Sequence, residues 1–225
     1  MSPQQLSFDL PVRAALGRED FFVSPANAEA VAMIEGWQDW PTRKLILAGP
    51  PGSGKTHLAH VWAALSGARI VAAADLPSAN IPSLAAGSVA VEDIDHVAGY
   101  RDAEEALFHL HNLTLAEGHA LLLTARSAPQ FWPLCLPDLM SRMQGTLLTQ
   151  LRAPDDALLA AVLTKLFADR QIAPSPDTIP YLARRMDRSF EAARDVVVAL
   201  DAAAMAEGRS VNRSLAAQVL DNRSH

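Results

Sequence analysis

The eight residues Gly49-Pro50-Pro51-Gly52-Ser53-Gly54-Lys55-Thr56 constrain this chain more than any other segment, because they match the whole GxxxxGK[ST] pattern of a phosphate-binding loop. The apolar run 45–48 before the loop is typical of a buried strand, and residues 57–62 after it are typical of a helix. Glycines let backbone N–H groups converge on a phosphate without an intervening Cβ atom. The order of strand, loop and helix therefore predicts an α/β fold that binds a nucleoside phosphate.

Two side chains at the end of the loop have predicted roles toward this ligand. Lys55 would place its charge at the β- and γ-phosphates, and Thr56 would offer its hydroxyl to Mg²⁺. The helix that starts here would direct its positive dipole end toward the anion. The alternative is a Gly/Pro-rich turn without a ligand, and the flanking elements favour the ligand-binding interpretation.

Composition narrows the class of protein. The chain has 225 residues, half of them hydrophobic, which suffices for a large domain or for a domain and a smaller companion. No apolar run approaches the roughly 20 residues needed to span a bilayer, and no signal peptide is expected. The net charge of −6 argues against broad nucleic-acid affinity. The single cysteine, Cys135, excludes an intrachain disulfide, and its apolar neighbours predict a small core residue rather than a nucleophile.

Apolar runs alternate with helical patterns as far as residue 152. The runs are continuously apolar, which is typical of parallel strands covered on both faces. Segment 75–87, rich in proline, serine and alanine, is expected to be a connection, and segment 128–143 is interrupted by prolines and expected to be irregular. Strands are expected at 45–48, 68–73, 88–93, 120–124 and 145–151, and helices from about 24 to 37, after the phosphate loop, and at 101–117.

Beyond residue 153 only helical periodicity recurs. We therefore expect an N-terminal tail at 1–19, an α/β nucleotide-binding domain with a parallel five-stranded sheet at 20–152, and a small all-helical lid domain at 153–225. The four helices of the last part are expected at 155–169, 177–186, 189–206 and 212–221.

Polar residues end two of the predicted strands. Glu92 and Asp93 occupy the place of the acid pair of nucleoside triphosphatases, where one carboxylate orients Mg²⁺ and the next polarises the attacking water. Acids at strand ends also cap helices, but the phosphate loop favours the metal-site interpretation. Thr124 ends the next strand, where its hydroxyl either senses the γ-phosphate or satisfies nearby backbone.

Arg142 follows a proline-containing segment just before the last strand. An arginine here has two interpretations. It reaches the nucleotide of a neighbouring molecule and stabilises the charge of the transferred phosphate, or it forms a surface ion pair with Asp138, four residues earlier. The residues alone leave both interpretations open.

Taken together, these features resemble the DnaA clade of the AAA+ ATPases. The resemblance rests on the phosphate loop, the Glu92–Asp93 strand, the Thr124 strand, the segment LPDLMSR at 136–142 and the helical C-terminal part. Residues 20–30 resemble the segment whose backbone frames the adenine in that clade. The chain ends where DnaA continues into its DNA-binding domain, and in this it is similar to the regulatory members that lack that domain.

The resemblance implies roles residue by residue, with ADP or ATP and Mg²⁺ as cofactors. It implies Mg²⁺ ligation by Thr56, Glu92 and Asp93, a part in hydrolysis for Asp93 and Thr124, and presentation of Arg142 to the nucleotide of DnaA. The nucleotide contacts that it implies are Phe22, Val23, Pro50, Pro51, Gly52, Ser53, Gly54, Lys55, Thr56, His57 and Arg188.

The N-terminal segment adds a second partner. Gln5, Leu6, Phe8 and Leu10 resemble the short peptide by which such regulators and polymerases dock on the replicative sliding clamp, the β subunit of DNA polymerase III. The glutamine amide suits a polar notch, and the three apolar side chains serve as anchors. The implied partners are the clamp and DnaA, with DNA reached only through the clamp and no membrane. The expected location is cytoplasmic, at the nucleoid or replisome, and self-association stays open.

Two departures from the clade bear on catalysis. Glu92 stands where the clade has a shorter aspartate, and Glu191 stands at the place of its second sensor arginine, with Arg188 and Arg194 one turn away on either side. A carboxylate near the γ-phosphate repels it. The hypothesis is therefore that the site holds ADP better than ATP and that the chain has at most a weak ATPase activity of its own.

The leading interpretation is a regulatory adaptor that stimulates ATP hydrolysis by DnaA and so limits re-initiation of replication. The alternative is an autonomous AAA+ ATPase that loads or remodels another replication protein, which leaves the segment from Gln5 to Leu10 unexplained. A third interpretation, an anchor that binds DNA directly, suits neither the acidic charge nor the expected lack of a DNA-binding domain.

Overall fold

A computed structural model describes residues 21–223. The predicted tail and its clamp-binding residues Gln5, Leu6, Phe8 and Leu10 lie outside the described residues and stay predictions. Five parallel strands form one sheet in the order β2-β3-β4-β1-β5, so that β1 lies inside it, between β4 and β5. The strands fall where the apolar runs predict them: β1 is Lys44–Ala48, β2 Arg69–Ala72, β3 Val89–Glu92, β4 Leu121–Ala125 and β5 Leu147–Gln150.

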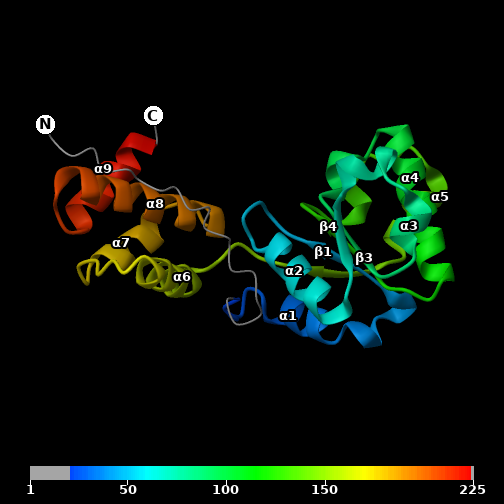
Figure 1. Ribbon diagram of the computed structural model, residues 1–225, viewed down its shortest axis with the longest axis horizontal. Helices are drawn as coiled ribbons and strands as arrows, with labels where there is room; N and C mark the ends of the chain where they lie inside the picture. The colour runs from blue at the N-terminus through cyan, green and yellow to red at the C-terminus, as the bar shows by residue number, and fades with distance from the viewer. Residues whose placement is uncertain (1–20, 224–225) are drawn as a thin grey trace, which may run out of the picture.

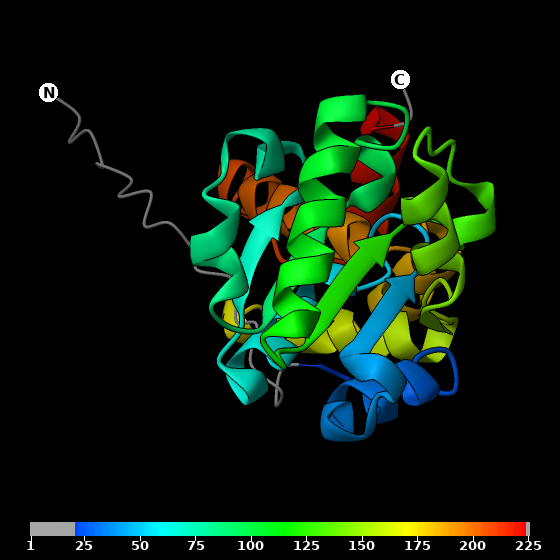
Figure 2. The ribbon, with the colours of Figure 1, turned by 90° about the vertical axis from the view of Figure 1, so that its right-hand side faces the viewer.

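Helices cover both faces of this sheet (Figures 1 and 2). Successive residues of a strand point to opposite faces, and each face has its own core. Leu45 and Leu47 of β1 pack with α1 and α2, whereas Ile46 packs with α3, α4 and α5. This arrangement confirms the predicted sheet covered on both faces. The helix bounds are α1 Ala28–Glu35, α2 Lys55–Ser66, α3 Ile81–Ala85, α4 Arg101–Ala116 and α5 Pro137–Gln144.

Two helices, α3 and α5, lie in segments that were expected to be a connection and an irregular stretch, respectively. Their prolines stand in the first turn, where the missing N–H has no intrahelical partner to lose. Asn80 caps α3 by accepting a hydrogen bond from the Ser83 N–H, and Pro137 is the first residue of α5. Short 3₁₀ turns complete the α/β part at Trp37–Asp39, Pro41–Arg43, Ala73–Ser78, Ile94–His96 and Pro129–Phe131.

The C-terminal part is helical and has its own apolar core, which includes Phe167, Leu200 and Leu215. It lies beside the α/β part, and the loop between β1 and α2 reaches toward it (Figure 1). Its helices are α6 Asp156–Asp169, α7 Thr178–Arg185, α8 Phe190–Glu207 and α9 Arg213–Arg223. Within residues 21–223 no helix has the length and apolarity to cross a membrane.

Cys135 is exposed, so the prediction of a core position is wrong. The chain runs from a buried Leu134 through Cys135 to a partly buried Leu136, and the apolar neighbours rather than the cysteine face the core. The backbone N–H of Cys135 donates to the buried Glu104 carboxylate, and its thiol Sγ lies 3.8 Å from the Gly99 carbonyl oxygen.

Candidate nucleotide site and an exposed arginine

The phosphate loop joins β1 to α2 with two glycines in left-handed backbone conformations. Gly52 has φ +67° and Gly54 has φ +99°, values that residues with a Cβ rarely adopt. Gly54 directly precedes α2, whose first residue is Lys55. The loop therefore ends at a helix N-terminus, which is where an anion is stabilised by free N–H groups and the helix dipole.

Lys55 lies at the centre of the loop and is almost fully buried. Its Nζ donates to the carbonyls of Gly49 at 2.8 Å and Pro50 at 2.9 Å. Burial lowers the pKa of Lys55 from its ordinary value, and the nearby Asp93 carboxylate opposes that effect. Thr56, the next residue, is exposed, so the loop presents a cation at its centre and a hydroxyl at its rim.

The acid pair lies at the carboxyl end of β3. Asp93 has a left-handed φ of 58°, and its N–H donates to the Thr124 hydroxyl oxygen at 3.0 Å. Thr124 is buried at the end of β4 and therefore ties the ends of two neighbouring strands together. Both Asp93 and Glu92 raise the pKa of Lys55 through their charge, which places the pair within electrostatic reach of the loop.

Two buried oxygens of this region, Ser53 Oγ and Glu92 Oε1, have no hydrogen-bond partner among the described residues. Buried polar atoms without partners are costly, and a phosphate with its cation would satisfy such atoms. No group of three or more His, Cys, Asp and Glu side chains suited to a metal occurs within 21–223. Mg²⁺ would therefore depend on Thr56, the acid pair and the phosphates themselves, as is usual for this ion.

Arg126 lies close enough to Lys55 for its charge to lower the Lys55 pKa, and the sequence analysis did not identify it as a candidate. It directly follows β4, and the Gly49 N–H donates to the carbonyl of its neighbour Ala125 at 3.0 Å. The Arg126 N–H donates to Asp95 Oδ1 at 3.0 Å, and its guanidinium lies 3.6 Å from Asp95 Oδ2 and 3.0 Å from His96 Nε2. The sequence feature that could have identified Arg126 is its position as a charged residue directly after a buried parallel strand.

The helical part contacts the phosphate loop through the first residues of α8. The Phe190 N–H donates to the Gly52 carbonyl at 2.9 Å. A Cβ atom on Gly52 would lie 2.3 Å from the Ser189 Cβ atom, so only glycine fits there. The Phe190 ring packs against Phe21, which packs edge-on against His57. Ser189 and Phe190 thus bring the lid helix onto the loop, and the sequence analysis assigned no role to either.

The other residues with predicted roles at the nucleotide site lie on the segments next to the phosphate loop and on the first turn of α8. Arg188 points toward the connection between the two parts, where its guanidinium lies 2.6 Å from Asp156 Oδ1. Glu191 is exposed in the first turn of α8. The Phe22 carbonyl accepts a hydrogen bond from the Asn27 amide at 2.8 Å, and half of the Val23 side chain is exposed.

Arg142 lies on α5 with its side chain exposed. Its guanidinium carbon is 5.1 Å from the centroid of the Phe108 ring, and none of the ion pairs between described residues joins it to Asp138. Its carbonyl accepts a hydrogen bond from Nζ of Lys44, the first residue of β1. The phosphate loop follows the last residue of the same strand, about 13 Å further on. Arg142 therefore lies at the opposite end of β1 from the loop.

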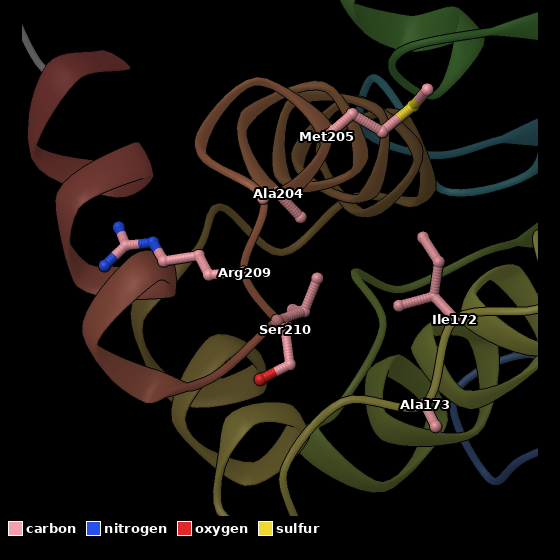
Figure 3. A pocket seen from close by; sticks show the side chains of 8 residues that line it. Ile172, Ala173, Ala204, Met205, Arg209 and Ser210 are labelled. Carbon is pink, nitrogen blue, oxygen red and sulfur yellow. The ribbon is translucent and has the colours of Figure 1, made fainter.

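A hollow of about 390 Å³ lies in the helical part and is not the nucleotide site (Figure 3). It includes Ala204 and Met205 near the C-terminal end of α8, whereas the phosphate loop meets the N-terminal end of that helix. Its lining is mostly apolar, and Arg209 is the only charged residue in it. The hollow offers no group of charged side chains to a phosphate.

No family model matches the chain. Its sequence is 26% identical over 208 residues to the chromosomal replication initiator protein DnaA of Thermomicrobium roseum, an alignment that covers 81% of this chain and 45% of that protein. The chain spans about half the length of the curated DnaA relatives that it matches.

Solved structures show the same fold. Domain III of the Thermotoga maritima replication initiation protein DnaA superposes with a TM-score of 0.78 at 18% identity, covering 95% of this chain and 98% of that one. The AMPPCP-bound DnaA from Aquifex aeolicus superposes with a TM-score of 0.69 at 16% identity, over 81% of this chain and 64% of that one. The chain is therefore similar in sequence to DnaA and has the fold of its AAA+ domain.

Proposed function

We propose that this chain is a nucleotide-bound regulator of the Hda type, which promotes hydrolysis of the ATP held by DnaA and so limits re-initiation of replication. The similarity to DnaA supports a role in replication initiation. The further step, from a relative of DnaA to a regulator of DnaA, depends on Arg142.

The position of Arg142 carries this proposal. The residue is exposed and lies at the far end of β1 from the chain's own phosphate loop. An arginine that stabilises phosphoryl transfer has to touch the transferred group. Arg142 is too far from its own loop for that role, but it is free to enter the nucleotide site of another molecule. A guanidinium that acts in trans on the ATP of DnaA fits this geometry.

The nucleotide of the chain itself is proposed to be ADP, or ATP, with Mg²⁺. The loop N–H groups, Lys55 and Thr56 would hold its phosphates and cation. Bound Mg²⁺ would neutralise phosphate charge and orient it. The binding of AMPPCP by the Aquifex aeolicus DnaA supports an adenine nucleotide. The exposed Glu191 on the helix that touches the loop is consistent with at most a weak ATPase activity.

The sliding clamp is the second proposed partner, through Gln5, Leu6, Phe8 and Leu10. Replacing both Gln5 and Phe8 by Ala is expected to abolish clamp binding, because the polar contact and the largest anchor are lost. Nucleotide affinity should stay unchanged in the same protein. Surface plasmon resonance on immobilised clamp measures the first quantity. Unchanged clamp affinity would remove the clamp from the proposal.

The proposal is tested by single-turnover hydrolysis of radiolabelled ATP pre-bound to DnaA. The chain is added with clamp loaded on DNA, with free clamp, or alone. Fast hydrolysis is expected only with loaded clamp, and nucleotide extracted from the purified chain should be ADP. Hydrolysis that does not respond to the chain would reject the regulator. Rapid ATP turnover by the chain alone, indifferent to clamp, would favour the autonomous loader or remodeller instead.

A further inference from the structure

The side of α4 that meets α5 carries Glu104, Phe108 and His111, spaced i, i+4 and i+7. This spacing places the three residues in one row along the helix. Glu104 accepts a hydrogen bond from Leu136, just before α5, and Phe108 contacts the Arg142 guanidinium. His111 contacts Lys44, which in turn donates to the Arg142 carbonyl. We propose that Phe108 is the positioning residue of the Arg142 guanidinium, on a row of α4 that also fixes both ends of α5.

Glu104 anchors the start of α5. Its carboxylate is fully buried, and its partners are backbone N–H groups. Oε1 accepts from Gly99 at 2.7 Å, and Oε2 accepts from Cys135 at 2.9 Å and from Leu136 at 2.8 Å. Leu136 directly precedes the first residue of α5. Charge-assisted bonds of this length are strong, so the entry into α5 is held to α4.

Lys44 and Thr146 anchor the other end of α5. The Arg142 carbonyl accepts from Lys44 Nζ at 3.0 Å and from the Thr146 hydroxyl at 2.8 Å. Lys44 Nζ also lies 3.4 Å from His111 Nε2. Because an ammonium only donates, His111 Nε2 accepts, and the Nδ1–H is left to donate to Asn112. The backbone at Arg142 is therefore tied to both α4 and β1.

With its backbone fixed, Arg142 keeps only the freedom of its side chain. The ring of Phe108 is partly buried and packs against the core, so it offers a fixed face. The guanidinium carbon lies 5.1 Å from the ring centroid, within the range of a cation–π contact. An ion pair with Asp138 would occupy N–H donors of the guanidinium. An aromatic face restrains the group while its in-plane N–H donors stay available for a phosphate.

This inference rests on the proposed function, because it concerns how Arg142 is presented to the nucleotide of DnaA. Phe108→Leu keeps an apolar side chain but removes the aromatic face. It is expected to lower the maximal rate of stimulated hydrolysis about threefold to tenfold, which corresponds to the loss of a cation–π contact. The concentration of chain that gives half of that maximum should not change, since the contact surface remains. Phe108→Tyr restores the face and should restore the rate.

Two further variants separate the possible failures. His109→Ala, at an exposed position of α4, is the matched control and should keep the full rate. Arg142→Ala should lose the stimulation. If Arg142→Ala stays active, the proposed function fails and this inference falls with it. If Arg142→Ala is inactive while Phe108→Leu keeps the full rate, or if Phe108→Tyr does not restore it, only the role of Phe108 is overturned.

A measurement on the wild-type chain covers the case in which Phe108→Leu does not fold. The ring should shift the Arg142 Hε proton resonance upfield and order its N–H bond vector. The guanidinium of Arg101, exposed and paired with Glu105, is the reference. An Arg142 signal as mobile and unshifted as that of a free arginine would overturn the inference.

Discussion

The phosphate loop and the Arg142 region lie at opposite ends of β1, and they are built in different ways. The loop is made of consecutive residues, 49–56, whose backbone turns on two glycines in left-handed conformations. The Arg142 region is assembled from α4, α5 and β1 by side-chain contacts between residues far apart in sequence. A site of the first kind depends on glycines, and a site of the second kind depends on buried polar and aromatic partners.

The difference implies that each end can be damaged while the other stays intact. The strand that joins the two ends is buried along its whole length, since every residue of β1 is buried. Variants at the loop should change nucleotide affinity without altering the environment of α5. Variants at the α4 row should alter α5 without changing nucleotide affinity.

Gly52→Ala is expected to have the largest effect on stability. The new Cβ atom meets Ser189 in a left-handed backbone conformation, so backbone strain and overpacking add to about 2–5 kcal/mol. The variant should bind nucleotide weakly and unfold at lower urea concentration. Gly208→Ala, with φ +60° and open space around it, carries the strain alone and is the control. Equal losses for the two variants would show that the lid helix does not rest on the loop.

Glu104→Gln tests the Arg142 region, at the opposite end of β1 from the phosphate loop. An amide nitrogen cannot accept from a backbone N–H, so at least one of the bonds to Gly99, Cys135 and Leu136 is lost, at a cost of about 1–3 kcal/mol. Cys135 is the only cysteine of the chain and is exposed, so a spin label on it reports on this segment.

The label should become more mobile in Glu104→Gln and stay unchanged in Gly52→Ala, while Glu104→Gln keeps its nucleotide affinity. Glu105→Gln, at the exposed neighbouring position, should change neither quantity. If the label responded equally to Gly52→Ala and Glu104→Gln, the two ends would not be independent.

The smallest expected effect is a loss of stability in acid. Burial, together with the charges of Lys44 and Arg142, lowers the pKa of His111 to about 4, although its hydrogen bond with Asn112 opposes this effect. The unfolded chain then binds a proton near pH 6.5, whereas the folded chain does not, so stability is complete above pH 6.5 and falls as the pH drops toward 4. The loss attributable to His111 should reach about 1–2 kcal/mol by pH 5.

Urea unfolding at pH 8 and pH 5 measures this loss. His111→Gln should reduce the difference between the two pH values, and His109→Gln, at an exposed position, should leave it unchanged. If the His111→Gln protein lost as much stability in acid as the wild type, a group other than His111 would cause that loss.

The comparison also explains what the sequence could predict. The loop, the five strands and the four C-terminal helices are local patterns, and all of them appear where they were expected. The helix α5 was not expected, because its segment is interrupted by prolines, although Pro137 is in fact the first residue of the helix. The contact between Gly52 and Ser189 joins residues of separate parts of the chain, and no local pattern indicates it.

The same limit applies to Arg142. Its residue type and neighbours suggested that its guanidinium contacts either a partner's nucleotide or Asp138. The contact with Phe108 depends on how α5 packs against α4, which no local pattern indicates. Glu104 shows the limit most clearly, because a glutamate in the first turn of a predicted helix is ordinarily solvent-exposed. Its burial follows from three backbone N–H groups that only the tertiary structure brings to it.

In the proposed function the chain holds one nucleotide with its loop and acts on another with Arg142. This proposal is tested most directly by measuring two quantities for Arg142→Ala: its own nucleotide affinity and the rate at which it drives hydrolysis of DnaA-bound ATP. We expect unchanged affinity and a rate reduced about 1,000-fold or more, the effect of losing an arginine finger. Weakened affinity together with an undiminished rate on DnaA would contradict it.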